Sequence, residues 1–545
     1  MLKPISESPH QLNRERHRRH NRNLGNLTGE FPTMTTKKTK QPMKSNKGRT
    51  IAKARTSTTS LQKSDWNALY VGGKWMRGGS RRVIQDRNPY DNKVITEVPS
   101  ATNEDVDRAF EIAESAQRKH LHRTPQELAQ PIHEAISYIE RNAREISRLL
   151  AIESGSSATF ARFQVYQIAL PMMREAASFP FRAFGQSMTS VIPGKENLVK
   201  RLPTGIVSVI SPWNVPLHLS MRAVAPALAL GNAVILKPSS DTPICGGLLI
   251  AKIFEQTSLP KGLLSVLPGG GGQIGDRIAS HPKTRVVAFT GSTEVGKQVA
   301  SKAASVLARP AMELGGNNVH IVLEDADLKR AIDGGIFGSF IHQGQICMRI
   351  NRHLVHRSLY EEYVSRFTAR AKSLKWGDPR DEDTIIGPVI NERQRDKILG
   401  FIKKSVEQGA KITTGGKAHG NIIEPTVLRD TKNEHAASYY EVFGPVAPII
   451  PFDTDAEAVR LANGTPYGLS GGVHSRDLGR AYRVASQVET GMIHVNDQSI
   501  NDEPHVPFGG MKESGMGRYN GETIIAEMTE LKWISFQIEP RSYPF

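Results

Sequence analysis

Two residues of this chain have the types of a nucleophile and its base. Cys347 is one of only two cysteines among 545 residues, and it follows a glycine, Gly344, at the end of an expected helix. A thiol on such a turn acts as a nucleophile when a nearby base or positive charge favours its thiolate. Glu313, in Glu-Leu-Gly-Gly, is the candidate base, because the paired glycines after it let backbone approach a ligand closely. Each residue also has a structural alternative, since a lone cysteine is often a small buried apolar residue and Glu313 could form a salt bridge.

Two α/β patterns would position these residues. In the first, continuous apolar strands alternate with helices, which predicts a parallel sheet covered on both faces that binds dinucleotides at the carboxyl ends of its strands. The expected strands are 205–210, 232–236, 263–267 and 285–289, and the expected helices are 216–229 and 242–257. The second pattern starts at Asn317 with a strand over 319–323 and a helix over 326–342 that leads to Cys347. The sequence therefore predicts an α/β protein with a doubly wound cofactor domain and a second α/β domain.

Scaffold elements precede and follow these patterns. Helical spacing starts at Asn103, which is expected to cap its helix, and returns over 124–153 and 158–176. Alternating residues around Pro193-Gly194 predict a hairpin over 186–201, and 531–536 resembles a strand.

Composition excludes several classes of protein. A chain of this length favours two or more domains, and neither an apolar run of membrane-spanning length nor an apolar leader segment appears in it, which argues against membrane spans and secretion. With two cysteines, Cys245 and Cys347, a reducing cytosol is the simpler setting. No metal site is expected.

The formal charge of +17 is concentrated at the N-terminus. Between Lys3 and Lys63 there are fifteen Lys and Arg against three acidic residues, a net +12, while the rest of the chain is near balance. A polar, basic segment without apolar periodicity predicts a disordered extension over residues 1–64. It could be solvated, precede a later start at Met34 or Met43, bind a polyanion or target an organelle. Nucleic acid is not an expected partner.

A series of ordered motifs makes the chain similar to a known family over roughly residues 65 to 540. The motifs are Ser211-Pro-Trp-Asn214, Lys237-Pro-Ser-Ser240, Phe289-Thr-Gly-Ser292, Glu313-Leu-Gly-Gly316, Gln343-Gly-Gln-Ile-Cys347, Glu441-Val-Phe-Gly-Pro445 and Pro507-Phe-Gly-Gly510. Together they resemble the NAD(P)-dependent aldehyde dehydrogenase superfamily. Pro216 to Arg222 and Lys237 to Pro243 resemble its benzaldehyde and vanillin dehydrogenase branch.

The resemblance implies a division of the chain. The NAD(P)-binding domain would cover 65–312, with an oligomerisation hairpin at 186–203, and the catalytic domain 313–510. Residues 511–545 would return to the first domain and end in an oligomerisation strand that pairs with a neighbouring subunit. A cytoplasmic homodimer or homotetramer is therefore expected.

The same resemblance assigns the catalytic roles. Cys347 would attack an aldehyde and form a thiohemiacetal, whose oxyanion Asn214 and the Cys347 backbone N–H would stabilise, where one lost donor typically costs ~3 to 4 kcal/mol. Hydride transfer would leave a thioester, and Glu313, its pKa raised by a partly apolar site, would activate water. Asn214 could instead be only a turn residue before Pro216.

The cofactor, NAD or NADP, would be held by a larger set of residues that the resemblance implies. Lys237 and Glu441 would contact the two riboses, and Phe443 would pack on the nicotinamide. Ser240 stands where many NAD-preferring members carry Glu, which makes NADP admissible because a repelling carboxylate is absent. Gly271 lies in a glycine run that could be only a flexible turn, whereas Gly291 to Gly296 opens a helix whose amides suit a phosphate. The whole set is Ser211, Trp213, Lys237, Ser240, Gly271, Gly291, Ser292, Gly296, Leu314, Glu441 and Phe443.

The expected substrate is an aromatic aldehyde of the benzaldehyde or vanillin kind. Residues at the positions of the family's aldehyde tunnel are Val215, Leu219, Arg222, Ile346 and Met348. Arg222 could pair with a phenolate or with a scaffold carboxylate. Aliphatic aldehydes, semialdehydes or a non-catalytic binding role are the alternatives.

Overall fold

Five parallel strands form the sheet from which the site is built. The computed structural model describes Leu61 and residues 66–545. In spatial order the strands are β9 (Leu264–Val266), β8 (Ala233–Lys237), β7 (Ile206–Ile210), β10 (Thr284–Thr290) and β11 (Arg309–Glu313). Antiparallel strands extend both edges: β1 (Leu69–Val71) and β2 (Lys74–Met76) beyond β9, and β23 (Gly515–Met516) beyond β11.

The strand order reverses between β7 and β10. From β7 the chain continues outward to β8 and β9, and it then returns to place β10 and β11 on the other side of β7. Ligands of doubly wound sheets bind at such a reversal, outside the carboxyl ends of the strands. The expected doubly wound parallel sheet is thus confirmed, and a ligand is expected near the ends of β7 and β10.

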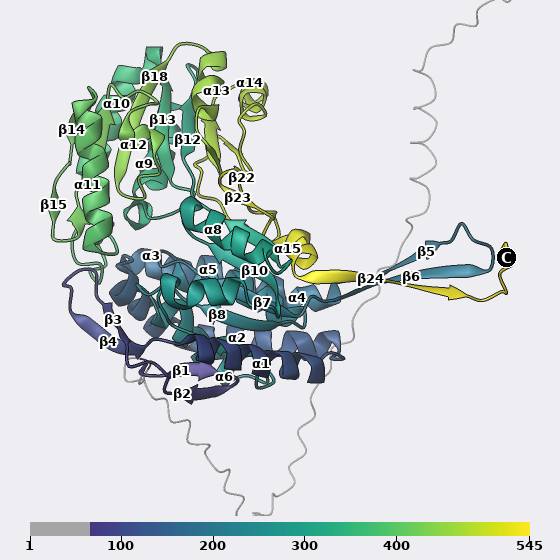
Figure 1. Ribbon diagram of the computed structural model, residues 1–545. Coiled ribbons are helices and arrows are strands. Elements are labelled where there is room, and N and C mark those ends of the chain that lie inside the picture. The colour runs from purple at the N-terminus through teal and green to yellow at the C-terminus, as the bar shows by residue number, and fades with distance from the viewer. Residues whose placement is uncertain (1–60, 62–65) are drawn as a thin grey trace, which may run out of the picture. The chain divides into compact units, whose positions relative to one another are not determined.

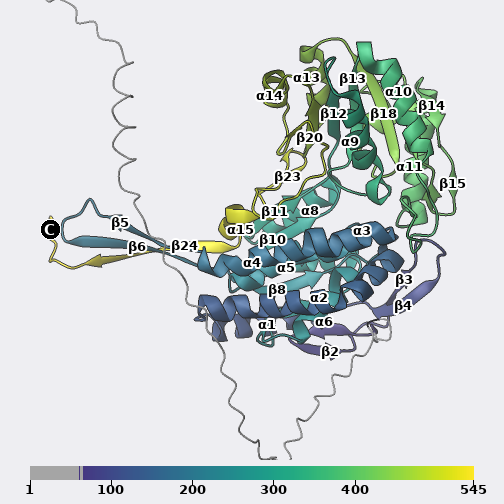
Figure 2. The same cartoon turned by 180° about the vertical axis from the view of Figure 1, so that it is seen from behind.

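Helices cover both faces of this sheet. One group, α1 (Asn103–Lys119), α7 (Asp276–Ala279) and α8 (Thr293–Ala304), packs on β7 to β11, and a second group is formed by α5 (Pro216–Ala229), α6 (Leu249–Glu255), α2 (Pro125–Ser154) and α4 (Leu170–Ser178) (Figures 1 and 2). Thr102, not Asn103, caps α1: its hydroxyl accepts from the Asp105 N–H and the Asp105 carboxylate accepts from the Thr102 N–H. The expected cap is wrong by one residue because Thr102 has the extended backbone that this reciprocal box requires.

A second parallel sheet carries the remaining lobe. Its order is β17 (Thr426–Arg429), β18 (Val446–Phe452), β13 (Ile350–His356), β12 (Asn318–Val322) and β20 (Gly471–His474), flanked by β14 (Lys411–Thr414) and β21 (His494–Val495). The helices around it are α9 (Leu328–Phe340), α10 (Arg357–Lys372), α11 (Glu392–Glu407), α12 (Ala436–Tyr439), α13 (Asp455–Asn463) and α14 (Leu478–Ala485) (Figure 1). The second α/β domain is confirmed.

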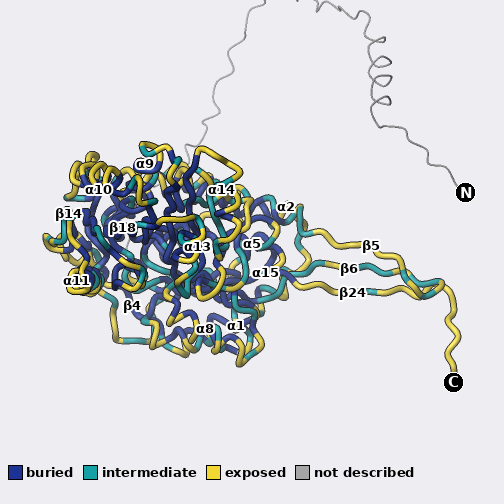
Figure 3. Tube along the Cα trace, turned by 90° about the horizontal axis from the view of Figure 1, so that it is seen from above, coloured by how far each residue is buried: buried dark blue, intermediate teal, exposed yellow. Residues whose placement is uncertain are grey.

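Three strands form an arm that projects from the rest of the molecule. β5 (Gln186–Thr189), β6 (Lys195–Pro203) and β24 (Thr529–Gln537) form a sheet in the order β24-β6-β5, which projects from the body with largely exposed or half-exposed residues (Figures 1 to 3). β24 pairs with β6 of its own chain from Thr529 to Gln537. This pairing uses one edge of β24, and no described strand pairs with its other edge, so the pairing of 531–536 with a neighbouring subunit stays a prediction.

Several shorter features complete the fold. The expected helix 158–176 consists of α3 (Ala158–Phe163), a π-helical segment (Gln164–Ala169) and α4. β3 (Val83–Arg87) and β4 (Val94–Pro99) form a hairpin. The remaining short elements are β15 (Ala418–His419), β16 (Ile422–Ile423), β19 (Tyr467–Gly468), β22 (Met511–Lys512) and α15 (Gly521–Glu527).

Two further expectations concerned membrane spans and the N-terminal segment. Within 66–545, no helix is long and apolar enough to cross a membrane. The basic segment lies outside the described residues except at Leu61, which is buried and whose N–H donates to Glu145, so the expected disordered stretch to residue 64 is wrong at Leu61.

Candidate active site

The turn that carries Cys347 is tightly constrained. α9 ends at Phe340, and His342, Gln343 and Gly344 then have positive φ angles of 52°, 56° and 70°. A Cβ on Gly344 would lie 2.3 Å from the Gly444 carbonyl oxygen, so no larger residue fits there without movement of the backbone. The expectation of a thiol presented behind a glycine at a helix end agrees with this geometry.

Two cavities meet at Cys347. One, of about 160 Å³, is lined by the segments that follow β7 and β10 and by the 441–443 segment; the other, of about 200 Å³, is mostly apolar. Cys347, Asn214 and Leu219 line both. A ligand in one cavity can therefore reach the same sulfur as a ligand in the other, as a transfer between two bound molecules requires.

Asn214 is held by the Cys347 turn at two points. Its side-chain Nδ2 donates to the Gln345 carbonyl oxygen at 2.9 Å, and its own carbonyl oxygen accepts from His342 Nε2 at 2.7 Å. Asn214 is buried in the segment between β7 and α5. Because an amide nitrogen has two hydrogens, one remains for another acceptor, such as a negatively charged oxygen of a ligand beside Cys347.

Glu313 ends β11 with a buried carboxylate. Neither oxygen forms a hydrogen bond with any described residue, and burial raises its pKa to about 8, an effect that Arg222 and Arg518 partly oppose. A Cβ on Gly509 would lie 2.8 Å from Oε1, so glycine leaves the room that this carboxylate occupies. Glu313 lines neither cavity, although its charge acts on Cys347. A carboxyl group with such a pKa can accept a proton near neutral pH.

The protein surroundings of Cys347 favour the thiol. Burial, followed by the charges of Glu313 and Glu441, raises its pKa to about 12, while Arg222 lowers it. Amides of the turn therefore do not activate the sulfur by themselves, and a base or a bound positive charge is required for thiolate formation. Cys245 is also free but fully buried, and it lies in the core.

The expected cofactor residues follow consecutive strands of the first sheet. Thr290 of β10 pairs with Glu313 of β11, and Ile210 of β7 pairs with Lys237 of β8. The carboxyl ends of these strands therefore lie at one edge. Each of the five strands ends at or is followed by expected cofactor residues: Gly271 follows β9, Lys237 ends β8 and Ser240 follows it, Ser211 and Trp213 follow β7, Gly291 and Ser292 follow β10, and Leu314 follows β11.

Part of this set lines the smaller cavity. Trp213, Gly291, Ser292, Glu441 and Phe443 do so together with Cys347 and Asn214. The others, Ser211, Lys237, Ser240, Gly271, Gly296 and Leu314, do not line it.

The smaller cavity has the groups that a dinucleotide needs. Ser292 caps α8, so the first backbone N–H groups of a 12-residue helix open towards the cavity, a suitable site for phosphate. Phe443 meets Trp213 edge to face at 5.3 Å, and Glu441 accepts from the Gly316 N–H at 2.9 Å. Burial raises the pKa of Glu441 to about 7, yet about half of the group is still ionised at neutral pH and can accept from ribose hydroxyls. These residues fit NAD(P).

Lys237 and Ser240 lie farther along the edge. Lys237 is buried, its Nζ donates to the Pro238 carbonyl oxygen, and burial lowers its pKa to about 8, with Asp241 opposing. Ser240 Oγ donates to the Gly269 carbonyl oxygen at 3.4 Å, which links this loop to the glycine run containing Gly271. Ser240 also lines a separate hollow with Arg87 and Arg393.

Apolar and aromatic side chains line the larger cavity. All five residues expected in an aldehyde tunnel belong to its wall, namely Val215, Leu219, Arg222, Ile346 and Met348. The sequence reasoning missed its rings and several aliphatic residues: Phe160, Phe163, Phe337, Phe508, Ile168, Ile341 and Ile500. The spacing of Phe160, Phe163 and Gln167 on one helical face was the available signal, but nothing local showed that this face borders Cys347.

Arg222 belongs to a buried network. Its Nη2 lies 3.3 Å from Asp502 Oδ1, and His218 Nε2 lies 3.2 Å from the other oxygen of Asp502. The guanidinium stacks 3.7 Å above the Phe508 ring centre. Although burial alone would raise the pKa of Asp502, Arg222 and His218 hold it well below its usual range. Arg222 was expected to pair either with a phenolate or with a scaffold carboxylate, and the structure shows it paired with the carboxylate of Asp502.

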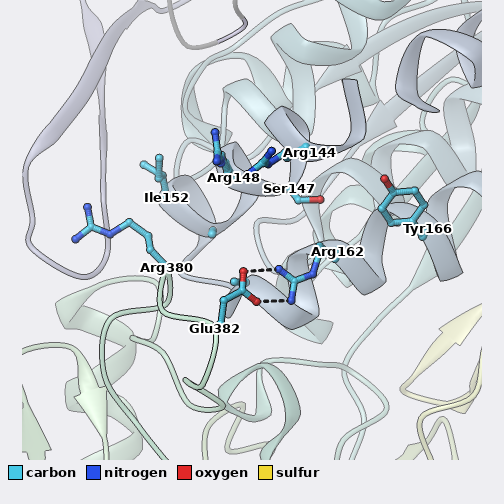
Figure 4. Close-up of a pocket in the computed structure, with 10 residues that line it drawn as sticks. Arg144, Ser147, Arg148, Ile152, Arg162, Tyr166, Arg380 and Glu382 are labelled. Atoms are coloured by element: carbon cyan, nitrogen blue, oxygen red, sulfur yellow. Dashed lines mark hydrogen bonds and ion pairs between the residues drawn. The ribbon is translucent and has the colours of Figure 1, made fainter. Parts of the chain in front are cut away.

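A hollow of about 590 Å³ lies apart from these cavities. Arg144, Arg148 and Arg162 line it, and Arg162 forms a two-fold ion pair with Glu382 (Figure 4). None of its lining residues lines either cavity at Cys347. Its size therefore does not make it the reaction site.

Comparison with known proteins gives one consistent result. The model of the aldehyde dehydrogenase family matches residues 75–534. A benzaldehyde dehydrogenase of Bacillus subtilis (strain 168) is 47% identical over 485 residues, covering 89% of this chain and 100% of that protein. A vanillin dehydrogenase of Corynebacterium glutamicum is 42% identical, covering 86% and 97%. The crystal structure of a Staphylococcus aureus betaine aldehyde dehydrogenase in complex with NAD+ superposes with a TM-score of 0.86 at 31% identity, covering 89% and 97%.

Proposed function

The chain belongs to the aldehyde dehydrogenase family, and we propose that it oxidises aromatic aldehydes to carboxylic acids with NAD(P)+. The observation that carries the proposal is the apolar, ring-lined cavity that ends at Cys347, where it meets the cavity suited to a dinucleotide. Benzaldehyde and vanillin dehydrogenases among the relatives support an aromatic substrate.

The reaction would begin at Cys347. Its sulfur, as the thiolate, bonds to the aldehyde carbon, and the carbonyl oxygen becomes an oxyanion within reach of the second Asn214 Nδ2 hydrogen and the Cys347 backbone N–H. The smaller cavity, with Trp213, Ser292 and Glu441 in its wall, would hold NAD(P)+, which would supply the hydride acceptor for this carbon. The protein then holds a thioester on Cys347.

Glu313 would complete the turnover. Its carboxylate accepts a proton from a water molecule whose oxygen attacks the thioester carbonyl, and the acid leaves as the Cys347 sulfur regains a proton. Because the pKa of Glu313 is about 8, part of its carboxyl group is ionised at neutral pH and can accept the proton from water. The protonated carboxyl group can then release this proton again. This arrangement favours hydrolysis over acyl transfer to another thiol.

The aromatic preference follows from the cavity wall. A planar ring can stack on Phe160, Phe163, Phe337 or Phe508, and such contacts add about 0.5 to 1.5 kcal/mol beyond burial of apolar area. Arg222 would stabilise the wall through Asp502 and would not bind a phenolate.

The cofactor, assembly and location belong to the same proposal. Ser240 carries no charge that would repel a 2′-phosphate, so both NAD+ and NADP+ are proposed as cofactors. The arm of β5, β6 and β24, with exposed Leu531, Trp533 and Phe536, supports a homodimer or homotetramer. A cytoplasmic location agrees with the two free cysteines.

Steady-state kinetics with a panel of aldehydes tests the proposal. Benzaldehyde, vanillin, short aliphatic aldehydes and semialdehydes are each assayed with NAD+ and separately with NADP+. We expect kcat/KM to be highest for the aromatic members, and Cys347→Ser to abolish turnover. Much higher kcat/KM for aliphatic aldehydes would overturn the substrate assignment, and absence of NAD(P)H formation with every aldehyde would overturn the activity.

A further inference from the structure

His342 connects the turn before Cys347 to the segment after β7 that carries Asn214. Its Nε2 lies 2.7 Å from the Asn214 carbonyl oxygen, and its ring stacks on Phe160 at 4.6 Å with 20° between the planes. It is fully buried and has a left-handed backbone. Left-handed backbone costs energy for a residue with a bulky side chain, so the contacts of the imidazole must offset that cost.

The hydrogen bonds define the state of the ring. A carbonyl oxygen can only accept, so Nε2 carries the hydrogen that is donated to Asn214. The other nitrogen, Nδ1, faces the Ser156 hydroxyl at 3.4 Å, and that oxygen accepts from Gln164 Nε2 at 2.9 Å. Burial lowers the pKa of His342 to about 4, so the ring is neutral during turnover. A neutral ring whose hydrogen is donated to a carbonyl does not serve as the base for Cys347.

Asn214 is therefore fixed from both ends by one short turn. His342 holds its backbone carbonyl, and the Gln345 carbonyl oxygen holds one hydrogen of its side-chain amide. Both partners lie within five residues of Cys347 in the sequence. A displacement of the turn would thus move the amide and the sulfur together, and their relative position would be kept.

We propose that His342 is a positioning residue for the oxyanion site, whose Nε2–H keeps the Asn214 amide directed at the oxygen that becomes charged when Cys347 attacks. This inference rests on the proposed function, because it assigns His342 a part in the same step. It predicts that loss of the imidazole weakens reactions that form an oxyanion and spares reactions of the sulfur that do not.

Two substitutions at position 342 separate the side chain from the backbone. His342→Gly removes the ring while keeping a residue that adopts positive φ without strain, and His342→Asn keeps both an N–H donor and tolerance of the left-handed backbone. Gln343→Gly is the matched control. Gln343 is the neighbouring buried residue with positive φ, but its amide holds the Gly155 and Pro388 carbonyl oxygens and does not contact Asn214.

Three reactions of each folded variant are compared. Aldehyde oxidation and hydrolysis of 4-nitrophenyl acetate both pass through an oxyanion, whereas alkylation of Cys347 by iodoacetamide does not. For His342→Gly we expect kcat to fall about 10- to 100-fold in the first two reactions, less than removal of a direct donor costs, with KM and the alkylation rate changed only slightly. His342→Asn should recover part of kcat, and Gln343→Gly should lower the melting temperature while kcat of the folded protein falls much less.

A double substitution decides whether the effect passes through Asn214. In an Asn214→Ala background, His342→Gly should cause little further loss, because residues that act through one another are not additive. The proposal is overturned if His342→Gly keeps full kcat, or if alkylation slows by the same factor as ester hydrolysis. It is also overturned if the fold losses in kcat caused by the two single substitutions multiply in the double variant. If the wild-type protein oxidised no aldehyde, the proposed function would fail. The effect of His342→Gly on the rate of ester hydrolysis, compared with its effect on the alkylation rate, would still test the role of His342.

Discussion

Glu313 combines two properties that rarely occur in a structural carboxylate. It is buried, and neither oxygen has a hydrogen-bond partner within the described chain. An unpaired buried carboxylate costs free energy, and the usual result is a raised pKa, here about 8. A salt-bridge role, the alternative left by the sequence, does not fit these surroundings, because Arg222 and Arg518 act on Glu313 only through their charge and neither forms an ion pair with it.

The pKa of Glu313 predicts the pH dependence of thioester hydrolysis. Below pH 8 the carboxyl group is mostly protonated and cannot accept a proton, so the hydrolysis rate should rise about tenfold per pH unit and level off above pH 8. Rapid mixing with benzaldehyde, followed by acid quenching to count acylated Cys347, measures this step. Glu313→Gln should still give a burst of about one NAD(P)H per site. The slow turnover that follows should not become faster as the pH rises. A hydrolysis rate that is flat from pH 6 to 9 in the wild-type protein would contradict the assignment.

Packing between elements places α8 next to β11. A Cβ on Gly296, in the second turn of α8, would lie 2.2 Å from the Leu314 side chain, so the helix packs closely on the residue after Glu313. Gly296→Ala should therefore destabilise the protein by about 1 to 3 kcal/mol through overpacking and raise KM for the cofactor by moving the start of α8. Thermal unfolding and cofactor titration measure the two effects.

Gly400 provides the control for that substitution. It is an exposed residue within α11, and a Cβ there would meet no atom within 4 Å. Gly400→Ala should stabilise the protein by up to about 1 kcal/mol, because alanine favours helix more than glycine does. If both substitutions shifted the melting temperature in the same direction, the argument from close packing at Gly296 would be wrong.

Elements with strong local signals were predictable from the sequence. The helix expected over 216–229 has those bounds, since Pro216 suits a first helical position and the apolar run is continuous. β11 was not predicted as a strand, because Arg309 and Pro310 interrupt the apolar pattern that is typical of a buried strand. Only its pairing with β10 shows that it is one. The same limit applies to the site: Cys347, Glu313 and Asn214 were proposed from motifs, whereas the Asp502–Arg222 pair joins residues 280 apart that no local pattern connects.

At the scale of the whole molecule, the first question is the basic N-terminal segment. The most N-terminal described contact is that of Leu61, so removal of residues 1–58 leaves this contact intact and removes most of the net +12 found before residue 64. We expect the shortened protein to keep its kcat and melting temperature and to elute earlier from heparin in a salt gradient, since exposed positive charge binds polyanions in a salt-dependent way. Lost turnover would show instead that the segment contributes to the enzyme.

The arm raises the second question, because its strands bury little against their own subunit. Leu531 and Trp533 lie on the same face of β24 and are 62% and 65% exposed, and apolar surface of this kind on a projecting sheet marks an interface. The double substitution Leu531→Asp and Trp533→Asp should convert the oligomer to monomers in light scattering, because a dimer would bury two pairs of charges. Lys532→Glu, which changes charge on the opposite face, should leave the mass unchanged. Since Cys347, Glu313 and Asn214 all belong to one chain, Cys347 of the monomer should still be alkylated. A wild-type protein that was itself monomeric would contradict the role of the arm in oligomerisation.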